Sequence, residues 1–345
     1  MIRHTNDPPN AEAELSDLGE GVVPADRFYV RCNFPVPAFD ARGWQLDFAG
    51  AVARPRRWTL DELAALPAVE RTVTLECAGN GRTLMRPAPP GTPWGLGAVG
   101  TARFGGVRLA DLVTASQPAS SVVELVFTGA DHGTVEPEGA ISYQFNLDLA
   151  TATTDGPMLA WTMGGRALTP EHGFPVRLVV PGHYGMRSVK WLTSITAVEQ
   201  PFAGHFPRKY RYRGEHGLPD ETPVGPMRVR SLFTWPADGE RLYPGRVTLR
   251  GIAWSGVAPV AAVEVGIGGS WIPARLRRPL DAYGPVIWTL PWSPSEPGRH
   301  VLAVRATDET GNRQPAEPVW NEGGYGNNVT QQVSIEVRER AMRPI

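Results

Sequence analysis

A single thiol, Cys77, follows an apolar run at residues 71–75 and precedes a glycine-rich turn and Arg82. A thiolate is a soft donor for transition metals, and it ligates well only where positive charge or backbone N–H groups lower its pKa. The turn at residues 78–81 can bring N–H groups close, and Arg82 can bring the charge. The segment suits a metal-ligand loop, and a small buried hydrophobic residue at a strand end is the alternative interpretation of Cys77.

A second group of polar residues lies further along the chain. His172 and Arg177 are five residues apart in EHGFPVR, which leads into an apolar run. Both side chains can therefore lie at one mouth of a sheet. Taken singly, each residue has a simpler interpretation: His172 is a loop histidine that caps a turn, and Arg177 is a surface strand charge. Lys190, further along the chain, is a solvated lysine in the same sense.

Six stretches, in order along the chain, make residues 28–337 resemble the sulfite oxidase family of molybdenum enzymes. They are FYVRCNFPVP from Phe28, TLECAGNGR around Cys77, PWGLGAVGTARFGGVRL ending at Leu109, EHGFPVRLVVPG from Glu171, RSVKWL from Arg187 and WNEGGYGNN from Trp320. The resemblance implies a molybdopterin cofactor whose molybdenum takes Cys77 as its one protein ligand. A single thiolate leaves other coordination positions open for oxo and water ligands.

The resemblance also implies roles for further residues. It implies cofactor contacts from Tyr29, Arg31, Asn33, Asp131, His172, Arg177, Arg187, Ser188 and Lys190. It implies a substrate pocket made by Arg31, Arg82 and Trp94, because guanidinium groups can hold the oxygens of a pyramidal oxyanion and leave its lone pair free. The alternative is that the two arginines pair with carboxylates such as Glu76 or Asp47.

The chain departs from the family pattern at four places. Trp161, in MLAWTMGG, stands where the family has a tyrosine near the oxo group, and an indole cannot relay a proton as a phenol can. Thr289, in PVIWTLPW, is nearest to the place of a further family arginine, so we expect an anion pocket that is one charge weaker. Asn33 replaces a cofactor-binding histidine, and Gly81 takes the first arginine place of the cysteine motif. These departures concern the substrate more than the cofactor.

The elements that must position these residues divide the chain. After an N-terminal extension at residues 1–27, residues 28–221 have the mixed pattern of an α+β molybdopterin-binding catalytic domain. Thr59 and Glu62 have the spacing of a capping box at the start of a helix. We expect strands at residues 44–52, 71–77, 121–129 and 175–182, and short helices at residues 59–66 and 107–116.

Residues 222–340 have a different pattern, which follows a polar and basic connecting segment at residues 206–225. The runs VTLRGIAWSG, VAAVEVGIGGSW, PVIWTLPW, RHVLAVRATDETG and NVTQQVSIEVRE are short strands separated by turns. Such spacing predicts an all-β immunoglobulin-like sandwich. The resemblance implies that this domain makes a homodimer, although its tryptophans Trp254, Trp271, Trp288 and Trp292 could equally belong to its core.

The composition limits the classes of function. The chain has 345 residues, of which 42% are hydrophobic and 20% charged, and its formal net charge is −1. The charge shows no basic excess, so we expect neither nucleic acid nor acidic lipid as a partner. No apolar run is long enough to span a bilayer, and no signal peptide or twin-arginine leader is visible. We therefore expect a cytoplasmic protein by default, or a periplasmic one if a leader has been removed.

The resemblance implies oxidation of sulfite to sulfate by oxo transfer. No haem, flavin or iron–sulfur signature is visible, so we expect an external one-electron acceptor such as a c-type cytochrome. Nitrate reduction at the same cofactor and another oxidised-sulfur substrate are alternatives, and a more remote one is a non-catalytic immunoglobulin-like binding protein. The sequence assigns no role to Cys32, and one disulfide between the two cysteines stays possible.

Overall fold

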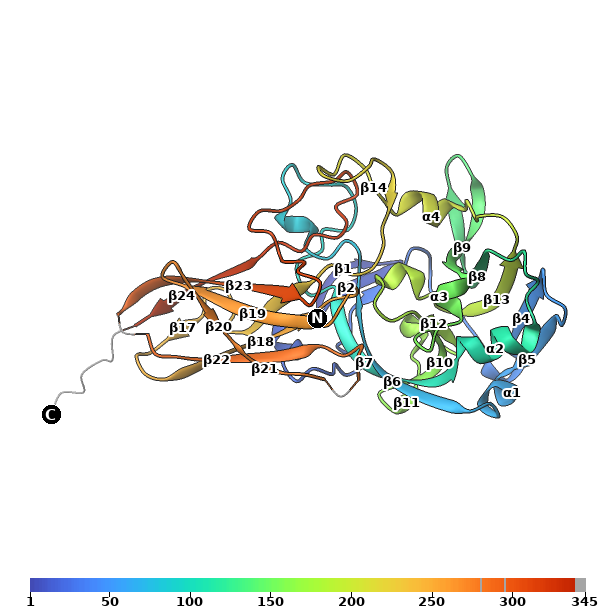
Figure 1. The fold of residues 1–345 in the computed structure, drawn as a ribbon, viewed down its shortest axis with the longest axis horizontal. Helices are drawn as coiled ribbons and strands as arrows, with labels where there is room; N and C mark the ends of the chain where they lie inside the picture. Colours follow the sequence, from blue (N-terminus) through green and yellow to red (C-terminus); the bar gives the residue numbers. More distant parts are fainter. Residues whose placement is uncertain (280, 295, 339–345) are drawn as a thin grey trace.

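The computed structural model describes residues 1–279, 281–294 and 296–338. The molecule is elongated, with a lobe of strands alone at one end and a larger lobe of strands and short helices at the other (Figure 1). The prediction of an α+β chain that continues into an all-β region is confirmed.

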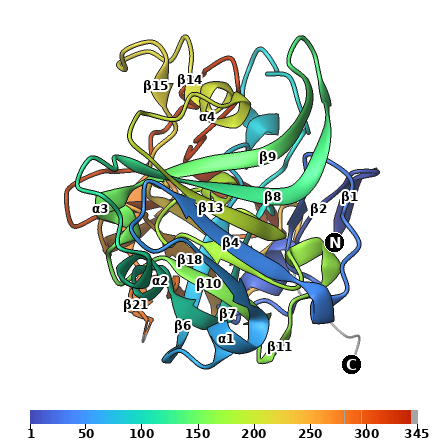
Figure 2. The ribbon, with the colours of Figure 1, turned by 90° about the vertical axis from the view of Figure 1, so that its right-hand side faces the viewer.

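Two five-stranded sheets form the larger lobe. In the first, the strands run in the order β11, β10, β7 and β6, with β12 paired to β10: Arg166–Ala167, Met158–Met163, Val99–Arg108, Ala68–Glu76 and Arg177–Val179. In the second, the order is β5, β4, β13, β8 and β9: Arg56–Thr59, Gln45–Gly50, Leu192–Val198, Glu124–Val135 and Gly139–Asp148. Figure 2 shows the long β8–β9 hairpin curving across this lobe.

The helices are short and lie at strand ends. They are α1 (Leu60–Ala64), α2 (Leu109–Ser116), α3 (Leu149–Ala152) and α4 (His205–Lys209). The capping box predicted for the first helix is confirmed, because the Thr59 backbone N–H donates to Glu62 and the Glu62 N–H donates to the Thr59 hydroxyl. The predicted strands and both predicted helices are present, with ends that differ by a few residues.

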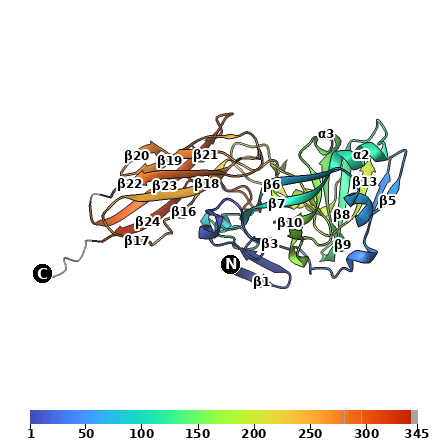
Figure 3. The ribbon, with the colours of Figure 1, turned by 90° about the horizontal axis from the view of Figure 1, so that it is seen from below.

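The first residues of the chain form a small sheet beside the larger lobe. Its strands are β1 (Ile2–Asn6), β2 (Pro9–Glu12) and β3 (Val30–Arg31), and Asn10 is the Cα partner of Arg31. Figure 3 shows this sheet close to the junction of the two lobes. The segment predicted as an N-terminal extension therefore pairs directly with a strand that carries a candidate site residue.

The all-β lobe is a sandwich of two antiparallel-rich sheets. One sheet has the order β16, β18, β22 and β21: Arg230–Trp235, Val247–Trp254, Val286–Trp292 and Arg275–Arg277. The other has the order β17, β24, β23, β19 and β20: Arg241–Leu242, Gln331–Val337, Gly298–Asp308, Val260–Ile267 and Ser270–Pro273. The short strands β14 (Arg211–Tyr212) and β15 (Thr222–Pro223) pair in the connecting segment.

Two clusters of buried apolar side chains hold these sheets. The cluster of the sandwich includes Trp288, whose ring centroid is 5.2 Å from that of Phe233. The larger cluster fills the other lobe and also takes in Leu232, Ile252 and Trp254 from the sandwich. The two lobes therefore share buried apolar surface, which favours a fixed arrangement between them.

The four sandwich tryptophans differ in burial. Trp254 and Trp288 are buried, whereas Trp271 is 37% exposed and Trp292 packs against the sandwich core from its edge. Across the described parts of the chain, no helix is both long enough and apolar enough to span a membrane.

Candidate functional site

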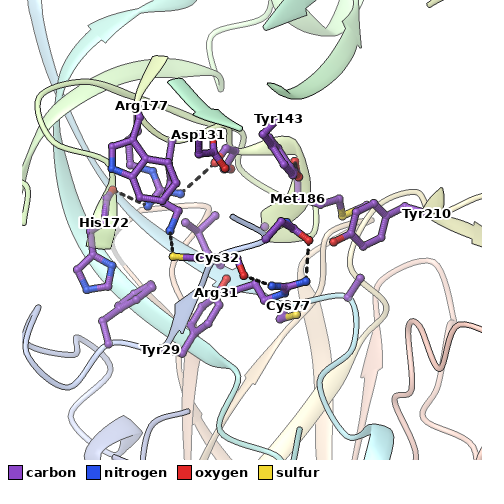
Figure 4. A pocket seen from close by; sticks show the side chains of 18 residues that line it. Tyr29, Arg31, Cys32, Cys77, Asp131, Tyr143, His172, Arg177, Met186 and Tyr210 are labelled. Carbon is purple, nitrogen blue, oxygen red and sulfur yellow. Dashed lines mark hydrogen bonds between the residues drawn. The ribbon is translucent and has the colours of Figure 1, made fainter. Parts of the chain in front are cut away.

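A pocket in the larger lobe gathers residues from strands and turns that are far apart in the sequence (Figure 4). Most of the predicted site residues line it: Tyr29, Arg31, Asn33, Cys77, Asp131, His172, Arg177, Ser188 and Lys190. The structure thus brings together the candidate metal ligand and the candidate phosphate ligands in one cavity.

The position of Cys77 follows from the pleat of β6. Side chains alternate between the two faces of a strand. Leu75 and Cys77 line the pocket, and Glu76 between them points to the opposite side, into the junction with the sandwich. Beyond Cys77 the chain turns back, and the Asn80 N–H donates to the Cys77 carbonyl at 2.9 Å.

Burial raises the pKa of the Cys77 thiol, while Arg31, the Gly79 N–H and Arg82 lower it. A bound metal cation would replace the thiol proton and would be stabilised by the same surroundings. Cys32 and Cys77 are both free thiols, so the structure contains no disulfide between them.

Arg31 is held in place by amide side chains. Its Nη2 donates to Asn33 Oδ1 at 2.7 Å, and its Nη1 donates to Asn10 Oδ1 at 3.1 Å and to the Cys32 carbonyl. No carboxylate pairs with Arg31 among the described residues. The positive charge of this guanidinium is therefore available to the pocket.

Arg82 lies just behind the pocket wall. Its Nη1 donates to the Thr92 carbonyl at 2.7 Å and its Nη2 to the Gly323 carbonyl at 2.9 Å, so both lobes hold it. A Cβ at Gly324, where φ is +59°, would come within 2.8 Å of Arg82 Nε. The side chain is 8% exposed, and it acts on the pocket through its charge.

The alternative interpretation, in which Arg31 and Arg82 pair with carboxylates such as Glu76 or Asp47, is wrong. Glu76 pairs instead with Arg230 at 2.8 Å, and Asp47 pairs with Arg57 on the surface.

The other end of the pocket is lined by buried basic side chains. Burial lowers the pKa of His172 to about 4 and that of Arg177 to about 10, and it also lowers the pKa of Lys190. The His172 Nε2 lies 2.9 Å from the Ala25 carbonyl, which can only accept, so Nε2 carries the proton of the neutral ring. The charged forms of these groups would be stabilised by an anion bound here.

Cys32 has a contact that the sequence did not reveal. Lys190 Nζ donates to Cys32 Sγ at 3.1 Å and to the Glu171 carbonyl at 2.7 Å, and it lies 4.1 Å from the centroid of the Trp191 ring. These three contacts fix the position of the ammonium group in the pocket wall.

Asp131 supplies an unpaired acceptor. Its Oδ1 is buried, lines the pocket region and has no hydrogen-bond partner among the described residues. Burial raises the pKa of this carboxyl to about 6, although the charge of Lys190 opposes the shift. A ligand that brings N–H donors would satisfy this oxygen.

Three of the predicted site residues do not line the pocket, in addition to Arg82. Trp161 lies at a bulge in β10, opposite Gly105 of β7. Cys77 lies near the other end of β7, because Glu76, the residue before it, pairs with Val99. Six strand residues extend about 20 Å, so the assignment of Trp161 beside the metal is corrected.

Arg187 and Trp94 point elsewhere. Arg187 Nη1 donates to the Asn146 carbonyl at 3.1 Å, and its guanidinium lies 5.3 Å from the Phe145 ring on β9. Trp94 is buried with its ring centroid 4.9 Å from that of His4. Both side chains pack into the wall around the site and not into the cavity.

The prediction that Thr289 stands near the anion pocket, at the place of a family arginine, is also wrong. Thr289 lies in the middle of β22, where it faces Arg250 and Arg275 on the neighbouring strands. The sandwich segment that does reach the site is the loop with Gly323 and Tyr325, whose ring centroid is 5.7 Å from the Arg82 guanidinium.

Two tyrosines of the pocket were missed. Tyr210 and Asn33 both line it, and the Tyr210 and Tyr325 ring centroids are 5.1 Å apart. Tyr143 also lines it and donates to the Met186 carbonyl at 2.7 Å. The expectation that Trp161 takes the place of the family tyrosine is therefore wrong, because Tyr143 and Tyr210 line the pocket and Trp161 does not. The only sequence signal for Tyr210 is the aromatic spacing in RKYRYR, inside a segment with no clear strand or helix pattern.

The fold and the pocket together define a molybdopterin-dependent oxidoreductase. The chain belongs to this family: the model of the oxidoreductase molybdopterin binding domain matches residues 33–206, and that of the Mo-co oxidoreductase dimerisation domain matches residues 222–338. The predicted family and its cofactor are confirmed.

The relatives include several sulfite oxidases and a nitrate reductase of Hordeum vulgare, which is 32% identical over 98% of this chain and 42% of that protein. The chain is 30% identical to the sulfite oxidase of Arabidopsis thaliana, over 97% of this chain and 93% of that protein. It is 34% identical to the mitochondrial sulfite oxidase of Macaca fascicularis over 96% of its own length, and it spans 64% of the length of that relative. The sulfane dehydrogenase SoxCD from Paracoccus pantotrophus has the same fold, with a TM-score of 0.85, 23% identity, and coverage of 98% of this chain and 90% of that one.

The side chains present fit the family cofactor. Cys77 offers a sulfur ligand, Asp131 offers a buried acceptor without a partner among the described residues, and the buried Arg177 and Lys190 offer positive charge. A molybdopterin has the matching parts: a metal, a polar pterin with N–H groups, and a phosphate. We assign these residues to its binding as a prediction from the geometry.

We expect Asp131→Asn to change the pH dependence of stability in the cofactor-free chain. The Asp131 pKa of about 6 lies above the ordinary value of 3.8, so its stabilising contribution is complete below pH 3.8 and is lost as the pH rises through 6. Between pH 4.5 and 7.5 the wild type should lose about 2 kcal/mol relative to the variant. Denaturant unfolding at both pH values measures this.

The exposed Asp26→Asn is the control and should show no such difference. Asp131→Asn should also retain less molybdenum after dialysis, because an amide is a weaker acceptor than a carboxylate. Parallel pH curves for Asp131→Asn and wild type would contradict the assignment of Asp131 as a buried, unpaired carboxylate.

Proposed function

We propose that this protein oxidises sulfite to sulfate and passes the electrons to an external one-electron acceptor. Each turnover consumes one sulfite and one water and yields sulfate, two protons and two electrons. The electrons leave one at a time, and a c-type cytochrome is an acceptor of suitable chemistry. The sulfite oxidase relatives and the family membership support this choice of substrate.

One observation carries the proposal: the Cys77 thiol opens into a pocket in which Arg31 is free of carboxylates and Arg82 adds its charge from behind the wall. When bound, the molybdenum cofactor supplies a redox-active metal with an exchangeable oxygen. A pyramidal dianion next to it needs positive charge that does not itself transfer protons, and guanidinium groups supply that charge at every pH of interest.

The residues of this chain divide the work between binding and proton handling. Arg31 orients the oxygens of sulfite, since Asn10 and Asn33 fix its guanidinium. The Tyr210 phenol, whose pKa burial raises, stays protonated and donates a hydrogen bond towards the same place. The Tyr325 ring packs at a tilt of 42° against the Tyr210 ring, which lines the pocket, and this contact helps to exclude water.

Lys209 adds a cation at the rim. It lies at the surface at the end of α4, next to the pocket residue Tyr210. The same helix is attached to the pocket by Phe206, whose ring centroid is 4.2 Å from that of the pocket residue Tyr143. Burial and the charges of Arg31 and Arg82 lower the pKa of Lys209, so the three cations act on one region. We propose that Lys209 attracts the anion to the pocket.

The dimerisation domain at residues 222–338 supports the further proposal that the protein is a homodimer. We also propose that the protein is cytoplasmic, with a periplasmic location as the alternative if a leader has been removed.

Cys77→Ser should reduce sulfite oxidation by more than about 100-fold in molybdenum-loaded protein, because an alkoxide is a poor substitute for a thiolate metal ligand. Cys32→Ser is the matched control, since a serine oxygen can still accept from Lys190, and it should keep most of the activity. The assay uses sulfite with ferricyanide or a c-type cytochrome. Turnover of nitrate with a reduced dye, without sulfite oxidation, would favour the alternative function.

Lys209→Met should raise KM for sulfite roughly two- to fivefold at low salt and leave kcat unchanged, because a rim charge affects capture and not chemistry. The difference from wild type should disappear at high salt. Arg299→Met removes a surface charge from the sandwich and serves as the control. A KM difference that persists at high salt would exclude the capture role.

Sedimentation of the full chain at micromolar concentration should show a species with twice the chain mass of 37.5 kDa. A monomer under these conditions would refute the homodimer.

A further inference from the structure

Glu76 is a buried carboxylate outside the pocket, and residues of the sandwich hold it. Its Oε1 accepts from Arg230 Nη1 at 2.8 Å and from Asn80 Nδ2 at 3.0 Å, and its Oε2 accepts from Trp254 Nε1 at 2.9 Å. Arg230 and Trp254 are Cα partners on the neighbouring strands β16 and β18. One pair of sandwich residues therefore holds the carboxylate from both oxygens.

Arg230 also holds the turn that follows Cys77. Its Nη1 donates to the Asn80 carbonyl at 3.2 Å. Gly81 has a φ of +81°, and a Cβ at this position would lie 2.7 Å from Arg230 Nη2. The guanidinium thus fills the space in which a side chain at position 81 would lie, which gives a physical reason for glycine there.

Two further hydrogen bonds attach the same turn to the sandwich. The Gly326 N–H donates to the Ala78 carbonyl at 2.7 Å, and Asn327 Nδ2 donates to the Gly81 carbonyl at 2.7 Å. The turn between residues 77 and 81 is consequently held by the sandwich at its start, its middle and its end.

We propose that Arg230 is a positioning residue for Cys77, and that the sandwich thereby sets the geometry of the metal ligand. By holding Glu76, directly before Cys77, and Asn80, within the turn after it, Arg230 fixes the direction in which Cys77 Sγ enters the pocket. The side chains of Arg230 and Glu76 are 1% and 2% exposed, so water cannot replace the pair. The inference rests on the proposed function in one respect, that Cys77 is the metal ligand.

The test compares holoenzymes by thermal unfolding and by the electron paramagnetic resonance signal of molybdenum(V), produced with a chemical reductant so that turnover is not required. Arg230→Met should lower Tm by roughly 5 °C or more, because Glu76 loses its cation, and should shift the g-values of the signal. Leu302→Ala, in the core of the sandwich and away from the turn, is the control. It should lower Tm and leave the g-values at their wild-type positions.

Wild-type g-values in Arg230→Met would overturn the proposal and reduce Arg230 to a structural role. If Arg230→Met yields no folded holoenzyme, Arg230→Lys decides: an ammonium leaves the space over Gly81 empty, so shifted g-values support the proposal and wild-type values overturn it.

Cys77→Ser separates this inference from the proposed function. Shifted g-values in Cys77→Ser with unshifted values in Arg230→Met would reject the positioning role alone. Unshifted values in Cys77→Ser would reject Cys77 as the ligand and with it the assignment on which the proposed function depends.

Discussion

The structure depends on a buried carboxylate that must be paired. Glu76 lies one residue before the candidate metal ligand and on the opposite face of the same strand, so it points away from the pocket. An unpaired buried carboxylate costs several kcal/mol. The pairing with Arg230 and Trp254 removes that cost only while the sandwich is docked, and it links the folding of one lobe to the active centre of the other.

The pocket is arranged for an anionic group. Burial lowers the pKa values of His172, Arg177 and Lys190, and it raises that of Asp131, so each group is held against its preferred charge state. Such a site is poorly satisfied by its own protein atoms and is completed by a ligand that carries both negative charge and N–H donors. This balance explains why polar side chains from several separate segments converge on one cavity.

The sequence allowed the local features to be predicted, since they depend on neighbouring residues. The Thr59 capping box and the strand that ends at Cys77 are examples. Trp161 was misplaced because a bulge and a strand register decide its position, and neither is visible in MLAWTMGG. Tyr210 lies in a segment without periodicity, and the Glu76–Arg230 pair joins residues 154 positions apart, so tertiary packing alone reveals them.

The contacts between the turn and the loop at Gly326 and Asn327 have a consequence for motion. A swing of one lobe against the other would break these hydrogen bonds and displace the turn that carries Cys77. These contacts oppose a mechanism in which one lobe swings on a hinge against the other to transfer electrons. The external electron acceptor proposed above would therefore dock at a centre that does not move between the lobes.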